Sequence, residues 1–210
     1  MKFSRTLLSL AVASAAFASA SASAVTFNLN IPAGAIYGTV TLTQFDSDTV
    51  AVHVDLGSVG PSTNGTYRFV DTGGHDAFGF NIAGGAAVIS GLTAGYEIAG
   101  AFTQSGFGTF TNGITCLESC QGGTNSNSPN DILDFHVDRA GITVGSFVAN
   151  NSNFIFTADL FGPNPTGGSV TFPVGASAPV AVVPEPGTYA LLLAGLGVVG
   201  FMARRRQPQA

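Results

Sequence analysis

The chain has 210 residues, and its 7 basic and 12 acidic side chains give it a formal net charge of −5. An acidic protein repels the phosphate backbone of nucleic acids and anionic lipid headgroups, so nucleic acid is excluded as a partner. Charged residues make up only 9% of the sequence, against about 25% in an average globular protein. Thr, Ser, Asn and Gly must therefore supply most of the polar surface.

Residues 1–24 have the three regions of a secretory signal peptide. Lys2 and Arg5 form a charged start, Leu7–Phe17 is an apolar stretch, and Ala22 and Ala24 form an A-x-A cleavage site. Removal of this segment leaves a mature chain that begins at the next residue. The pattern predicts export by the general secretion machinery.

The body between this signal and the basic end of the chain is more acidic than the whole. Residues 25–183 contain two basic and eleven acidic side chains, a formal net charge of −9. Such a surface attracts cations. The length of this body fits one domain of ordinary size with a buried core.

Residues 25–174 show the two-residue period of β-strands. In the segment 49–56, Val50, Val52 and Val54 alternate with polar or small residues, which puts the apolar set on one face. The segment 39–45 alternates in the same way, and the Asp-Ser-Asp turn between the two segments predicts a hairpin. Further strands are predicted at residues 67–70, 78–82, 86–89, 97–102, 133–137, 142–148, 154–160 and 170–174.

These short strands predict an all-β fold, an antiparallel β-sandwich with a jelly-roll or another Greek-key topology. No part of the body sustains a 3.6-residue apolar period, and the 28 glycines disfavour long helices. Two sheets packed about 10 Å apart suit the number and spacing of the strands. The phenylalanines expected to point inward are Phe69, Phe78, Phe80, Phe135, Phe154 and Phe156.

Two segments are predicted to be irregular. Residues 111–130 contain many strand breakers and both cysteines, Cys116 and Cys120. In an oxidising compartment these cysteines are expected to form a disulfide that fixes the shape of the loop, with a stabilisation of about 2 kcal/mol at most. Residues 175–183 are rich in Ala, Val and Pro and are predicted to be an extended linker.

Two acidic groups are candidate metal ligands. Asp134, His136 and Asp138 share one face of a predicted strand, but neighbours at this spacing lie about 6.6 Å apart, so a solvated polar face is favoured. Asp46 and Asp48 have the spacing of a calcium loop but lack the Gly and the distal Glu of an EF-hand. Calcium there is kept as a hypothesis, and no other cofactor is expected.

The body has no motif of a known catalytic class. The G-x-S-x-G, H-E-x-x-H and P-loop patterns are all missing from the sequence. A secreted hydrolase is one alternative, and it requires a pocket that brings His53, His75 or His136 together with carboxylates. A carbohydrate-binding module is another alternative. The chain has no Trp, so Tyr37, Tyr67 and Tyr96 are the expected residues for stacking on sugars.

The C-terminal part of the chain has three components in sequence. Pro184, Glu185 and Pro186 precede the apolar segment 188–202, which Arg204, Arg205 and Arg206 follow. The apolar segment is shorter than the roughly 20 residues of a typical membrane span, and the positive-inside rule keeps the arginines and residues 207–210 in the cytoplasm.

This arrangement resembles the PEP-CTERM sorting signal of Gram-negative bacteria. The resemblance covers residues 183–206 and implies recognition by exosortase, a membrane-embedded cysteine transpeptidase that cleaves near the Pro-Glu-Pro motif. The implied route runs from the inner membrane to the cell surface or the extracellular space. The resemblance also implies association with exopolysaccharide and biofilm, so we predict a non-catalytic structural or adhesive protein.

Overall fold

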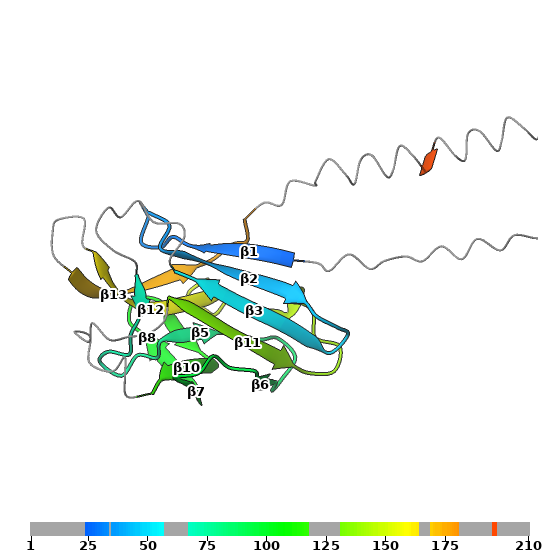
Figure 1. Cartoon of the computed structure of the whole chain (residues 1–210), viewed down its shortest axis with the longest axis horizontal. Helices are drawn as coiled ribbons and strands as arrows, with labels where there is room; N and C mark the ends of the chain where they lie inside the picture. The colour runs from blue at the N-terminus through cyan, green and yellow to red at the C-terminus, as the bar shows by residue number, and fades with distance from the viewer. Residues whose placement is uncertain are drawn as a thin grey trace, which may run out of the picture.

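Alternating apolar side chains give most strands one buried face, and two antiparallel sheets lie with these faces together in the computed structural model (Figure 1). The structure describes residues 24–33, 35–56, 67–117, 131–163, 169–180 and 195–196. The first sheet has the order β1-β2-β3-β11-β6, formed by Ala24–Leu29, Gly38–Gln44, Thr49–Asp55, Ile132–Asp138 and Val88–Ser90.

The second sheet has the order β13-β12-β5-β10-β7, and the short strand β4 pairs with β12. Its strands are Ser169–Ala176, Phe156–Pro163, Phe78–Phe80, Asn112–Cys116 and Tyr96–Ala99, with Arg68–Phe69 as β4. A separate hairpin joins β8 (Phe102–Gln104) to β9 (Gly108–Phe110). These pairings confirm the predicted all-β, antiparallel fold.

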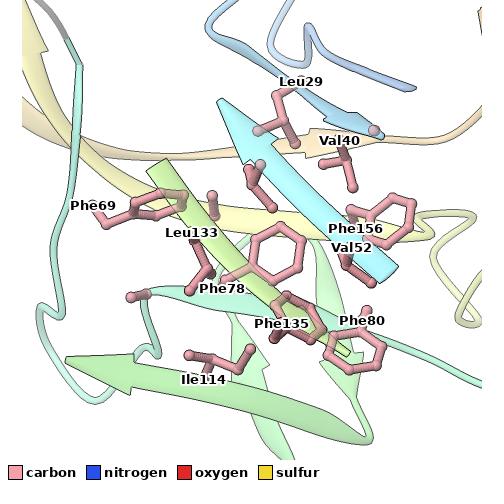
Figure 2. Close-up of a cluster of buried hydrophobic side chains, with 14 of the residues drawn as sticks. Leu29, Val40, Val52, Phe69, Phe78, Phe80, Ile114, Leu133, Phe135 and Phe156 are labelled. Atoms are coloured by element: carbon pink, nitrogen blue, oxygen red, sulfur yellow. The ribbon is translucent and has the colours of Figure 1, made fainter. Parts of the chain in front are cut away.

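Aromatic rings fill the space between the two sheets (Figure 2). Phe78 on β5 lies 6.1 Å from Phe135 on β11, and Phe80 lies 5.4 Å from the same ring. At the other side of the core, Phe27 on β1 meets Phe156 on β12 edge-on at 4.9 Å. These contacts cross from one sheet to the other, so the phenylalanines hold the two layers together.

The β8–β9 hairpin covers the outer face of the second sheet. Phe78 and Phe80 point inward, so Gly79 between them faces outward, and a Cβ on this glycine would lie 2.5 Å from the ring of Phe102. Phe102 stacks on Phe110, which is fully buried. A second, smaller apolar cluster therefore lies outside the main core.

Asn150 connects the β8–β9 hairpin to the turn at residues 150–154. Its side-chain amide donates to the carbonyls of Phe107 and Thr109, at 2.8 and 3.2 Å. Its side-chain oxygen accepts the backbone N–H groups of Ser152 and Phe154, both at 3.0 Å. Asn150 begins an Asn-x-Ser sequence, and these four bonds give its side chain a structural role.

The edges of the two sheets meet where β1 lies beside β13. Phe27 forms a bridge with Pro179, Ile31 forms one with Gly175, and the N–H of Val180 donates to the carbonyl of Thr26 at 2.6 Å. The predicted boundary at residue 174 therefore shifts. β13 continues to Ala176, and residues 177–180 of the predicted linker run along the domain.

Several predicted strand boundaries are wrong. The segment 142–148 contains a 3-10 helix, η1 (Val144–Ser146), because the side chain of Gln44 bonds to the carbonyl of Ile142 and the N–H of Val144. The segment 111–130 was predicted to be irregular, but its first part forms β10 inside the second sheet. The segment 97–102 divides at Gly100 into β7 and the start of β8.

Two more elements differ from the prediction. β1 is not among the strands predicted from the sequence, although Val25, Phe27 and Leu29 alternate in it as expected of a strand. Phe154 was expected in the core, but it is only partly buried and packs against Phe107 at 4.7 Å, outside the space between the sheets. The other five predicted phenylalanines are buried.

Phe156→Ala is expected to lower the free energy of unfolding by about 3–5 kcal/mol, because it removes a fully buried ring and leaves a cavity. Phe45→Ala is the matched control, since Phe45 is 67% exposed and its loss should cost about 0.5 kcal/mol or less. Denaturant unfolding of both variants measures the difference. Similar losses for the two variants would contradict the described core.

Candidate functional site

The predicted sites fall partly outside the described residues. Residues 184–186, the arginines at 204–206, Ala22 and Cys120 lie there, and so does the predicted membrane helix 188–202 except for residues 195 and 196. Ala24 is the first residue of β1. Cys116 is fully buried, and no free cysteine occurs in the described part of the chain. Its pairing with Cys120 stays a prediction.

The two groups of predicted metal ligands have other partners. Asp46 Oδ1 accepts the N–H of Asp48 at 2.8 Å, and Asp48 Oδ1 accepts the N–H of Gly141 at 2.8 Å. These carboxylates therefore stabilise the turn between β2 and β3. Among the residues that the structure describes, no group of three His, Cys, Asp or Glu side chains is arranged to hold a metal ion.

The outer face of the first sheet carries the predicted Asp134, His136 and Asp138 in a row along β11, as the alternation of residues predicts. Asp134 Oδ1 lies 2.6 Å from Nδ1 of His53 on the neighbouring β3. The ring of His136 stacks on the ring of Phe45, with centroids 5.4 Å apart. The three side chains thus have different partners.

Asp138 is the acceptor for two hydroxyl groups. Ser90 donates to Oδ2, and Thr49 donates to Oδ1 at 2.9 Å. The Ser90 hydrogen bond, helped by Thr49 and by the nearby His136, holds the pKa of Asp138 below its ordinary value. Asp138 therefore stabilises the folded state above the ordinary pKa of Asp, and this contribution is lost as pH falls through its lowered pKa.

A second group of carboxyls, which the sequence did not predict, lies at the loop between β4 and β5. Asp159 on β12 is 1% exposed and accepts the N–H of Thr72 at 3.1 Å as well as the Thr72 hydroxyl. Asp71 accepts the hydroxyl of Thr115. Asp76 completes the group, since it lies close enough to Asp71 to feel its charge. We name Asp71, Asp76 and Asp159 the acidic cluster.

Burial, together with the nearby charge of Asp71, raises the pKa of Asp76 to about 6, and the charge of His75 partly opposes this rise. Burial likewise raises the pKa of Asp159, although the bonds from Thr72 favour its ionised form. Asp76 Oδ2 is buried with no hydrogen-bond partner among the described residues. A Cβ on Gly113 would lie only 2.0 Å from Asp76 Oδ2, so the absence of a side chain at Gly113 leaves room for this carboxyl. The acidic cluster can therefore hold a proton at mildly acidic pH.

Two of the three tyrosines expected to stack on sugars are buried. Tyr67 and Tyr96 are buried, with 5% and 8% of their surface exposed. Tyr37 is half-buried and meets Tyr67 edge-on at 5.4 Å. The prediction is therefore wrong for Tyr67 and Tyr96, whose rings belong to the apolar core, while the half-buried Tyr37 packs against that core.

The three histidines divide between two parts of the molecule. His53 and His136 lie on the outer face of the first sheet, on β3 and β11. His75 is in the loop before β5, where its charge acts on Asp76 and Asp159. The structure therefore brings together His53 with Asp134, and separately His75 with the acidic cluster.

The described part of the chain defines an acidic β-sandwich, and no helix there is long and apolar enough to cross a membrane. The C-terminal segment of the chain indicates how the protein is exported. Residues 182–206 match the family model of the PEP-CTERM protein-sorting motif. No curated protein and no solved structure matches the chain. The motif implies an exported protein that exosortase processes.

Asp76→Asn is expected to remove a pH dependence of stability. The raised pKa means that the folded state gains stability from a protonated Asp76 below 3.8 and loses it as pH rises through about 6. Above this range the variant should be more stable than the parent by about 1 kcal/mol, a value reduced for solvent screening. Below the range the two should be equal.

Denaturant unfolding across this pH range measures the effect. Glu97→Gln is the control, because Glu97 is exposed on β7 and its loss should leave the profile unchanged. A parent and an Asp76→Asn variant with parallel profiles would contradict the assignment.

Proposed function

We propose that the body is a non-catalytic structural or adhesive component of the extracellular matrix, placed at the cell surface by processing at the Pro184-Glu185-Pro186 motif. The observation that carries this proposal is the PEP-CTERM match at residues 182–206, which follows a folded acidic sandwich in the chain. Matrix proteins act outside the cell, where the surface of the body makes the contacts with the polymer. The sorting motif supplies the delivery, and the body supplies the contacts.

The chemistry of the surface supports a role in contact rather than turnover. The carboxylates of Asp48, Asp134 and Asp138 bond to neighbouring strands and loops, so they hold the outer face of the first sheet in one arrangement. A fixed polar face suits weak, repeated contacts with a hydrated polymer. The net charge of −9 for residues 25–183 favours cationic groups or bridging divalent cations on the polymer.

The delivery step is tested by the intact mass of the protein isolated from its host. We expect a product that begins near Val25 and ends near Pro184, because both predicted cleavages remove an apolar segment with its basic flank. Replacing residues 184–186 by alanines should leave the C-terminal arginines in place. A parent protein that retains Arg204 to Arg206 would contradict processing at the motif.

The matrix role is tested by deletion of the gene. We expect a loss of matrix cohesion that the full chain restores and that a chain without residues 182–206 does not, because the second chain lacks its sorting motif. The measurement is the amount of polymer that stays with the cells after washing. Unchanged cohesion in the deletion strain would overturn the matrix role while leaving the delivery step intact.

A further inference from the structure

The outer face of the first sheet carries an exposed aromatic ring in a fixed position. Phe45, in the turn after β2, is 67% exposed, the largest exposure among the large apolar side chains in the described ranges. Its backbone N–H donates to the carbonyl of Thr49 at 3.0 Å. Its ring stacks on His136 with an angle of 28° between the planes. The stacking and the backbone hydrogen bond therefore hold the exposed ring of Phe45 at the surface.

The residues beside His136 in the sheet are small, so the surface next to the Phe45–His136 aromatic pair is low. In the strand register, His136 lies between Ala51 on β3 and Ser90 on β6. A Cβ on Gly91 would lie 3.6 Å from Nδ1 of His136, so the glycine brings the backbone close to this ring. The outer face is therefore low at Ala51, Ser90 and Gly91 beside His136, while Val88, two residues from Ser90 on β6, is 65% exposed.

Polar groups lie next to the aromatic pair on the same face. His53 and Asp134 form a hydrogen-bonded pair whose side chains are 48% and 57% exposed. Asp134 is two residues from His136 along β11, a separation of about 6.6 Å. An aromatic surface with a hydrogen-bonding pair at this distance matches the mixed character of a sugar, which has an apolar ring face and polar hydroxyls at its rim.

The charge of this face selects the kind of sugar. Asp46 and Asp48 are exposed in the turn that carries Phe45, and Asp138 follows His136 on β11. These carboxylates repel an anionic polysaccharide and attract a cationic one. A cation above an aromatic ring is further stabilised by the charge distribution of the ring. Charge and stacking therefore favour the same ligand.

We propose that the Phe45–His136 pair, with the His53–Asp134 pair beside it, binds a polysaccharide that contains cationic amino sugars. This inference rests on the proposed function and names the polymer that the body contacts. Phe45 supplies the stacking surface. Asp46, Asp48 and Asp134 supply negative charge and hydrogen-bond acceptors for the ammonium and hydroxyl groups.

The test uses protein purified from its host. A glucosamine hexamer is titrated into it, and calorimetry measures the heat of binding. At low salt and below neutral pH, where the amines are protonated, we expect measurable binding. Phe45→Ala should weaken it about tenfold or more, and Phe45→Trp should tighten it, because Trp gives the strongest cation–π contact. Ile98→Ala removes another exposed apolar side chain, on β7, and should leave binding unchanged.

Each other outcome overturns the inference. Equal binding by Phe45→Ala would show attraction between an acidic protein and any cationic polymer. Equal binding of an N-acetylglucosamine hexamer would remove the argument from charge, and self-association lost in Phe45→Ala without sugar binding would assign the face to a second copy. Matrix cohesion is measured separately, so failed sugar binding with the expected matrix phenotype contradicts this inference and leaves the proposed function standing.

Discussion

Contact between phenylalanine rings across the two sheets is the interaction on which the rest of the structure depends. Phe78 lies at the centre of it, because this ring meets Phe135 of the first sheet as well as Phe156 of its own sheet. With few charged residues and no Trp in the chain, these rings supply the largest apolar surface that burial can remove from water. Their fit fixes the distance between the layers, and the layers position both the acidic cluster and the Phe45 face.

The sequence predicted those parts of the fold in which one segment decides its own structure. The hairpin of β2 and β3 was predicted because Val50, Val52 and Val54 alternate along a single strand and a turn precedes them. The segment with η1 was mispredicted because its backbone partners come from Gln44, about a hundred residues earlier in the chain. β10 was not predicted because the segment 111–130 contains many strand breakers, although Ile114 is buried in this strand.

The same limit applies to the candidate sites. Asp134, His136 and Asp138 were placed on one face correctly, since that depends only on the period of a strand. The acidic cluster depends on how β12 lies beside the loop after β4, which no local pattern contains. The one available signal was Asp159, a charged residue in an apolar strand whose burial requires partners from elsewhere. The tyrosines misled because their exposure is a property of packing rather than of residue type.

The bond from Val180 to Thr26 places the last residues of the domain beside its first strand. Residues 181–183 separate this bond from Pro184, and three residues span at most about 11 Å. A polypeptide cut at both predicted sites, after Ala24 and near Pro184, would therefore have its two ends close together at one edge of the sandwich. A short peptide can join such ends into a closed ring, and new termini can then be opened in a surface loop without disturbing either sheet.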